Sequence, residues 1–570
     1  MVGFLKYYLR TNNSYMRRLI ICACLAIIAF NASYGADNGF LKGKILKIDM
    51  QDVVAERGGN SFQFSLSGIS TGSSVSLLSF ERALEKAAED DKIALIYMNT
   101  DHFSAGLAPM EEIREYLKRF SAAGKPVIAY GAGFSNASYY IASVADRVFL
   151  YPKGSGTLNG LGSTQFFLKD ALDTLGIDVQ LIRHGKYKSA GEMYIRNDIS
   201  PENREQYETM LNSIWGCMVE EMAASRGIDA ETFKGWIDNL ELSTANTWTE
   251  KGLVDGLKYR DEMEEYLCHL FGTTDPEKVK TVTLKDYIDD LKKGPSSKKI
   301  AVIFADGEIS RSGSEVAGER LSREIAKVRQ DSTVKAVVFR VNSPGGEVVG
   351  ADMIRREIEV LQKYKPVIAS YGSYAASGGY LISAGCEKIF LDNSTLTGSI
   401  GVFGMVPSFG KAIRKHLKVN PVSLGTNEHS TMGSGMAPLT PEEEAWYQQE
   451  IEGIYDDFVS VVADGRKVTK EYVDSIAQGR VWAGKDALRI KLADEKATVL
   501  EAVQYAAERA GLENYRIQMV PEVKSMFQQI MDGDSKKKDE PLVKDLLHPG
   551  FNAIARMPYI TIDTPNSILK

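Results

Sequence analysis

Short apolar runs alternate with amphipathic segments along most of the chain. In the C-terminal half, residues 299–304 and 336–341 are apolar runs that predict buried strands. Residues 320–328 and 351–364 carry apolar side chains at helical spacing and predict helices. Strands that alternate with helices of this length predict an α/β fold with mostly parallel sheets.

The same pattern occurs twice. Residues 125–129 and 365–369 are both Lys-Pro-Val-Ile-Ala, 240 positions apart, and Ser200-Pro-Glu is followed by Thr440-Pro-Glu at the same displacement. A shared period of this length indicates two copies of one domain, and it is too long for a solenoid of short repeats.

The repeat suggests where the domains begin and end. We expect a first copy in residues 37–290 and a second in residues 299–525, joined by a linker that contains Lys-Gly-Pro-Ser-Ser-Lys. Residues 526–570 are expected to be a charged spacer and a tail, of which residues 555–562 are able to dock on the rest of the protein.

The N-terminal residues 1–36 resemble an export signal or a membrane anchor. Arg17 and Arg18 precede an apolar stretch at residues 19–30, and small residues follow it. We expect an apolar helix, with the bulk of the protein outside the cytoplasm. The stretch is short for a spanning helix of about 20 residues, so a cleaved leader, a start at Met16 and a retained anchor all remain open. A buried core helix fits the basic flank less well.

Composition excludes several classes of protein. A chain of 570 residues is expected to form roughly two to four domains. The net charge of −7 gives no electrostatic reason to expect nucleic-acid binding. Beyond the apolar stretch, Cys217, Cys268 and Cys386 are too scattered for a disulfide framework or a metal cluster. We therefore expect a mechanism without metal or cofactor.

Two glycine-rich turns in the second copy are candidates for catalysis. Ser377 follows an apolar run and opens a turn that leads into a predicted helix, where its hydroxyl and the next N–H groups are exposed. Pro344-Gly345-Gly346 follows another strand, and such a turn can aim an N–H at a developing oxyanion. Close helix–strand packing and an ordinary turn explain the same small residues without any catalysis.

Three motifs together resemble a known family. Val-Asn-Ser-Pro-Gly-Gly at residues 341–346, Ser-Tyr-Ala-Ala-Ser-Gly-Gly-Tyr at 373–380 and Thr-Gly-Ser-Ile-Gly-Val at 397–402 occur in this order. They are similar to the C-terminal half of signal peptide peptidase A, the protease IV family of serine peptidases. The resemblance covers nearly the whole chain. It implies tandem duplicated domains with the fold of Clp protease and the crotonases, behind an N-terminal membrane segment.

The resemblance also implies residue roles. Ser377 would be the nucleophile, and Lys188, in Gly-Lys-Tyr-Lys-Ser-Ala, would be the general base donated by the first copy. Ser399 would orient the lysine, and the N–H groups of Gly346 and Gly378 would bind the oxyanion. A lysine with its ordinary pKa of about 10.4 is protonated, so a base at this position must be buried to lose its proton near neutral pH.

Other residues near the lysine offer alternatives. Lys186 is two positions away, and we prefer Lys188 because it occupies the family position. His184 and His429 leave a Ser-His arrangement open, although no acid that would orient either histidine is recognisable in the sequence.

The duplication supports a composite site. At a displacement of 240, Ser377 corresponds to Ala137 and Lys188 corresponds to Glu428. The first copy has Ser-Ala-Gly at residues 104–106 in place of Pro-Gly-Gly. Each copy therefore lacks half of a dyad, which predicts one site where the two copies meet.

By resemblance we expect a serine endopeptidase of the bacterial envelope, anchored in the inner membrane with its catalytic part in the periplasm. Its substrates would be apolar peptides such as signal peptide remnants, and it would form a homotetramer. Two other functions are weighed against this one: a crotonase-like acyl-CoA enzyme on the same fold, and a non-enzymatic envelope scaffold.

Overall fold

The computed structural model describes residues 40–50, 54–65, 68–101, 103–291, 296–313, 316–522 and 554–557. The expected N-terminal apolar helix in residues 1–36 lies outside these ranges. Within them, no helix combines the length and the apolar character that crossing a membrane requires.

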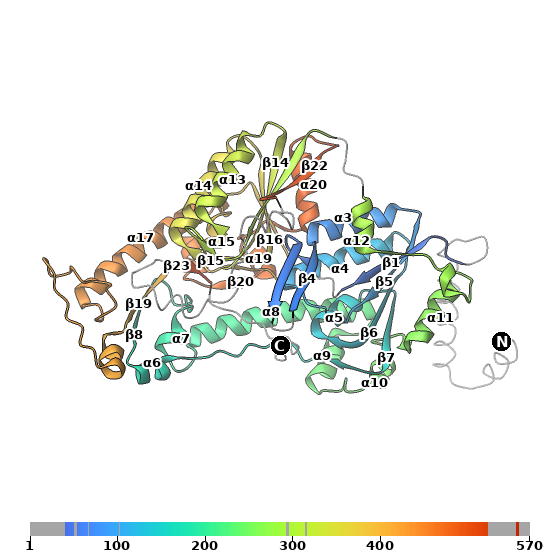
Figure 1. Cartoon of the computed structure of the whole chain (residues 1–570), viewed down its shortest axis with the longest axis horizontal. Helices are drawn as coiled ribbons and strands as arrows, with labels where there is room; N and C mark the ends of the chain where they lie inside the picture. Colours follow the sequence, from blue (N-terminus) through green and yellow to red (C-terminus); the bar gives the residue numbers. More distant parts are fainter. Residues whose placement is uncertain are drawn as a thin grey trace.

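The first copy is built on a sheet of six parallel strands with the order β10-β1-β5-β6-β7-β9. Figure 1 shows α11 on one side of this sheet and α3 and α4 on the other. Successive residues of β1 alternate between the two faces: Ile45 packs with residues of α11, whereas Leu46 belongs to the cluster that contains residues of α3 and α4. The elements are β1 (Lys44–Asp49), β5 (Ile93–Asn99), β6 (Val127–Ser135), β7 (Arg147–Thr157), β9 (Gly256–Leu257), β10 (Thr281–Thr283), α3 (Leu77–Glu89), α4 (Leu107–Ala122) and α11 (Arg260–Leu270).

The second copy repeats this layered arrangement. Its strands follow the order β20-β18-β16-β14-β11-β22, with β17 and β21 beside β16, and every pair is parallel except β18–β20. Helices α13, α14 and α17 cover one face, and α20 covers the other (Figure 1). The prediction of an α/β fold with mostly parallel sheets is confirmed. The elements are β11 (Lys299–Asp306), β14 (Val334–Ser343), β16 (Val367–Ala376), β17 (Lys388–Leu391), β18 (Leu396–Gly398), β20 (Val481–Ala483), β21 (Glu495–Lys496), β22 (Arg516–Val520), α13 (Gly318–Gln330), α14 (Val348–Gln362), α17 (Pro441–Arg466) and α20 (Val499–Arg509).

Equivalent residues make the same kinds of contact in both copies. Lys125 donates from Nζ to Ala87 O and Asp90 O at 2.8 and 2.7 Å, and Lys365 donates to Val328 O and Asp331 O at 2.6 Å each. The two lysines thereby satisfy carbonyls at the C-terminal ends of α3 and α13, respectively. The long helices α8 (Pro201–Arg226) and α17 each have 26 residues and begin at a Ser or Thr N-cap followed by proline.

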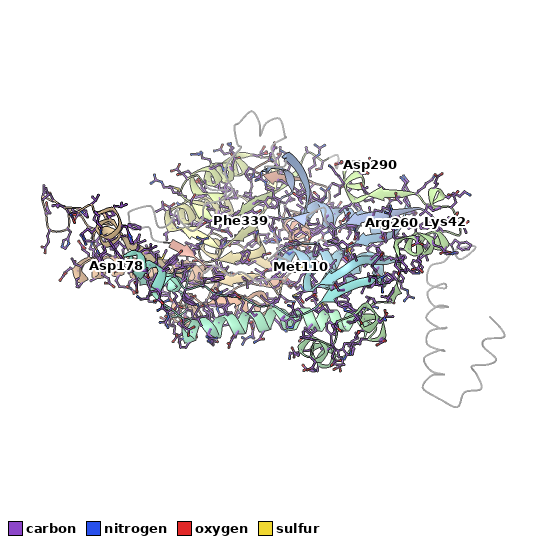
Figure 2. All side chains as sticks on the ribbon, turned by 60° about the horizontal axis from the view of Figure 1, so that its bottom comes forward. Lys42, Met110, Asp178, Arg260, Asp290 and Phe339 are labelled. Carbon is purple, nitrogen blue, oxygen red and sulfur yellow. The ribbon has the colours of Figure 1, made fainter. Side chains whose placement is uncertain are left out.

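A third sheet joins the two copies, with the order β13-β12-β15-β23-β19-β8. Its edge strand β8 belongs to the first copy in sequence, and it pairs antiparallel with β19 of the second copy over six residue pairs. Figure 2 shows the consequence: Asp178, the first residue of β8, lies beyond Phe339 of the second copy and far from Met110 of its own copy. The elements are β13 (Val316–Ala317), β12 (Ile309–Ser310), β15 (Gly345–Glu347), β23 (Ile554–Arg556), β19 (Phe403–Ser408) and β8 (Asp178–Arg183).

Shorter elements complete the described chain. A small sheet orders its strands β2-β4-β3. These elements are β2 (Val54–Ala55), β3 (Gly59–Ser65), β4 (Gly68–Ser76), α5 (Asn136–Ala142), α6 (Lys169–Leu175), α7 (Glu192–Ile195), α9 (Ala230–Asp238), α10 (Ala245–Glu250), η1 (Pro276–Lys278), α12 (Leu284–Asp290), α15 (Gly378–Leu381), α16 (Gly410–Ala412), η2 (Ile413–Leu417), α18 (Lys470–Ile476) and α19 (Gly484–Arg489).

A buried ionic network also holds the copies together. Arg340 of β14 is 1% exposed and contacts Glu56 at 2.8 Å and Glu112 of α4 at 2.6 Å. It also donates to Ser370 Oγ at 2.9 Å and to Tyr371 O at 2.8 Å. All five hydrogen-bonding directions of the guanidinium are therefore used, which is the condition under which a buried ion pair is tolerated.

We expect Arg340→Met to lower the free energy of unfolding by about 3–5 kcal/mol, because it leaves two buried carboxylates without their counter-ion. Urea unfolding followed by circular dichroism measures this change. Arg356→Met is the control: Arg356 is 57% exposed and its pair with Glu359 is worth less than about 1 kcal/mol. Equal midpoints for the two variants would contradict the assigned role of Arg340.

Candidate active site

Ser377 lies at the junction of β16 and α15. Its backbone has φ 54° and ψ −118°, a combination that L-residues rarely adopt, and its N–H donates to Gly398 O at 2.8 Å. Strained backbone of this kind is found preferentially at functional sites, where it holds a side chain in one direction. Ser377 is completely buried, as are most residues of β16, which leads to it. The expectation of an exposed hydroxyl was therefore wrong, because the Lys188 side chain of the first copy packs on it.

Lys188 reaches Ser377 from the first copy. After β8 pairs with β19, the chain turns at Gly185, which has φ +91° and lies so close to Gln478 that a Cβ would come within 2.4 Å of its backbone. Tyr187 N then donates to Gln478 O at 2.9 Å. These backbone contacts direct the next side chain, Lys188, into the second copy.

The Lys188 amine has three polar neighbours. Its Nζ lies 2.7 Å from Ser377 Oγ, 3.0 Å from Ser399 Oγ and 3.1 Å from Ser399 O. A neutral amine has two N–H donors and one lone pair, so it can donate to both Ser399 oxygens while it accepts the Ser377 proton. Among the described residues, the hydroxyl of Ser377 has one other acceptor nearby, Gly401 O, at the longer distance of 3.4 Å.

Burial sets the protonation of this lysine. Lys188 is completely buried, and desolvation lowers its pKa well below the usual value of 10.5. No carboxylate enters as an opposing cause among the described residues. Because a buried ammonium loses its hydration without a counter-ion, the neutral amine is favoured.

Ser399 follows β18 and also has an unusual backbone, with φ 48°. Its N–H donates to Arg480 O at 2.6 Å, which fixes the residue while both of its oxygens face the lysine. Gly401 and Gly479 pack directly on the Lys188 side chain, and a Cβ on Gly479 would lie 2.5 Å from the lysine Cβ. Only glycine leaves room for the amine to approach Ser377.

The glycine-rich turn lies beside this pair. Gly346 has φ +152°, and a Cβ on it would lie 1.9 Å from Ile309 O, so glycine is required there. Gly378 is the first residue of α15, where N–H groups have no partner within the helix. The next residue, Gly379, approaches Ser343 so closely that a Cβ would come within 2.4 Å of Ser343 O. The start of α15 therefore packs against the end of β14, next to the turn.

Comparisons with known proteins agree with this architecture. A sequence model of peptidase family S49 matches residues 119–271 and residues 359–513, one match in each copy. Protease 4 of Haemophilus influenzae is 33% identical over 505 residues, which cover 85% of this chain and 82% of that protein. The chain belongs to peptidase family S49.

Two further relatives extend the match to other organisms. Protease 4 of Salmonella typhi is 34% identical over 471 residues, covering 80% of this chain and 76% of that protein. The chloroplastic serine protease SPPA of Arabidopsis thaliana is 31% identical over 484 residues, covering 83% and 70%. The resemblance to the protease IV family is thus confirmed, and membership of S49 makes this chain a protease.

The alternative residues lie elsewhere in this S49 chain. Lys186 is exposed, with its amine 5.2 Å from the Tyr187 ring. His184 bonds to Glu452 at 2.6 Å, and His429 bonds to Glu443 at 3.1 Å. Both histidines therefore have a carboxylate partner that was not recognisable in the sequence. Both pairs are nevertheless partly solvent-exposed, and the described contacts of Ser377 Oγ are to Lys188 and Gly401.

Sequence reasoning missed the side chain that supports the lysine loop. Gln206 of α8 is 2% exposed; it donates to Tyr187 O and accepts from Val481 N, both at 3.1 Å. Beside it, Arg480 pairs with Glu205 at 2.7 Å and stacks on the Tyr187 ring at 4.8 Å. Gln206 and Glu205 belong to the first copy and their partners Val481 and Arg480 to the second, so these contacts fix the lysine loop across the boundary. No motif marks these residues.

Proposed function

We propose that this protease is a serine endopeptidase with a dyad of Ser377 and Lys188. The observation that carries the proposal is the 2.7 Å contact between a buried lysine amine and a buried serine hydroxyl from different copies. The lowered pKa of Lys188 supports its role as general base, because a neutral amine can accept the hydroxyl proton.

In the proposed reaction, Ser377 Oγ attacks the peptide carbonyl as its proton moves to Lys188 Nζ. The N–H groups of Gly346 and Gly378 bind the developing oxyanion. Lys188 then gives the proton to the departing amine, leaving an ester on Ser377. Water, deprotonated by the same amine, hydrolyses this ester. Ser399 holds the amine in place throughout.

The proposed substrates are apolar peptides, among them signal peptide remnants, cut in the bacterial envelope. The protein named putative signal peptide peptidase SppA of Enterococcus faecium is 32% identical over 215 residues, covering 36% of this chain and 62% of that protein, and its name supports this substrate class. The basic residues and apolar stretch of residues 17–30 support an inner-membrane location with the catalytic part in the periplasm.

We expect Ser377→Ala and Lys188→Met each to abolish cleavage of an apolar peptide, and Lys188→Met to abolish labelling of Ser377 by a fluorophosphonate. Lys186→Met, a lysine change two residues away, should leave both intact. EDTA should have no effect. Unchanged labelling in the Lys188→Met protein would remove the lysine from the mechanism, whereas a folded parent protein that never labels would favour an acyl-CoA enzyme or a scaffold.

A homotetramer is part of the proposal. From the last residue of η2 onward, four apolar side chains are strongly exposed: Leu417 at 68%, Val419 at 55%, Val422 at 81% and Leu424 at 88%. Exposed apolar groups on one segment favour a protein–protein contact.

Native mass measurement of the purified protein is expected to give a mass of four chains. Replacing Val422 and Leu424 with Asp should shift the measured mass to that of smaller species. An active monomer in the parent protein would contradict this assembly.

A further inference from the structure

The C-terminal strand β23 occupies the edge of the candidate active site. It pairs antiparallel with β15, placing Arg556 opposite Gly345, Ala555 opposite Gly346 and Ile554 opposite Glu347. On its other side, β23 pairs with β19 at Phe403. The chain continues in the same direction, because Met557 N donates to Pro344 O at 2.8 Å. The segment 554–557 therefore lies along the whole Pro-Gly-Gly turn.

Two side chains fix this segment. Arg556 is 11% exposed at its side chain and pairs with Glu308 at 3.0 Å. Met557, the residue that follows β23, is 2% exposed, so its thioether is buried. Burial of this apolar side chain favours the docked position of the segment.

The position of β23 matters because a strand edge accepts one partner. β15 is already paired with β12 on its other side, so the edge that faces β19 is the one at which β15 can receive an extended peptide. Peptides commonly bind to such an edge by adding a strand, with main-chain hydrogen bonds for affinity and side-chain contacts for specificity. That edge includes Gly346, the proposed oxyanion donor.

We infer that the gap between β15 and β19 is the peptide-binding groove, and that residues 554–557 are its resident occupant, which competes with substrate. The inference rests on the proposed peptidase function and adds to it a binding mode and a specificity residue. The substrate binds as an antiparallel strand between β15 and β19, with Glu308 contacting a basic side chain one position before a buried apolar one.

Competition within one chain affects the Michaelis constant. A tethered segment presents itself at an effective concentration on the order of millimolar, and substrate must displace it before the main-chain bonds to β15 form. Weakening the segment should therefore lower KM and leave kcat unchanged, since the chemistry after displacement is the same.

The test compares the full-length parent with the full-length double variant Arg556→Glu/Met557→Asp, using an uncharged apolar peptide substrate. We expect KM to fall roughly tenfold with kcat unchanged, as the millimolar competitor is removed. Arg355→Glu on α14, a charge reversal away from the groove, should change neither constant. In the single variant Arg556→Glu, adding Glu308→Arg restores the ion pair and should raise KM again.

A second measurement does not depend on the folding of these variants. The synthetic decapeptide Phe-Asn-Ala-Ile-Ala-Arg-Met-Pro-Tyr-Ile, which is residues 551–560, should inhibit the double variant competitively and the parent more weakly. Fluorophosphonate labelling of Ser377 is followed in parallel. Equal KM values and no inhibition, with Ser377 labelled in both proteins, overturn the resident-competitor inference alone. Absence of both labelling and cleavage in every protein overturns the peptidase function on which it rests.

Discussion

The arrangement of the site depends on one uncompensated buried amine. Lys188 is surrounded by hydroxyl and carbonyl oxygens and its pKa is lowered by burial alone. An ammonium in this position would lose its hydration without gaining a counter-ion, so the protein holds the lysine in its neutral form by excluding water. A nearby carboxylate would oppose this effect, and among the described residues none contributes to the pKa of Lys188.

Such a site requires the two copies to be docked rigidly. The amine and the hydroxyl come from different copies, and a displacement of 1 Å would break their hydrogen bond. The contacts that oppose such a displacement include the addition of β8 to β19, the Gln206 bridge and the buried Arg340 network. Glu112 extends that network to the start of α20, where it accepts from Val499 N at 2.5 Å. The distance between the amine and the hydroxyl therefore depends directly on how the two copies are docked.

Much of this could be predicted from the sequence, because the relevant signals are local. Hydrophobic alternation revealed the strands and helices, the 240-residue displacement revealed the duplication, and the three motifs singled out Ser377 and its turn. The crossing of β8 into the other copy was not predictable in the same way. Its pairing with β19 is made by backbone groups that every residue carries, and the two strands are more than 200 positions apart. Docking by residues 555–562 was anticipated, but the position of β23 between β15 and β19 was not. That position and the role of Gln206 were missed for the same reason: each depends on a distant partner.

The most direct test is titration of the lysine itself. With lysine labelled by 13C at Cε, the Lys188 resonance is assigned by its absence from Lys188→Arg, and its chemical shift is followed from pH 6 to 11. Because burial lowers the pKa of Lys188, the account predicts a midpoint well below 10.5 and a neutral amine over the working range of the enzyme. A midpoint near the ordinary value of about 10.4 would contradict the account, since the amine would then be protonated when the serine must be activated.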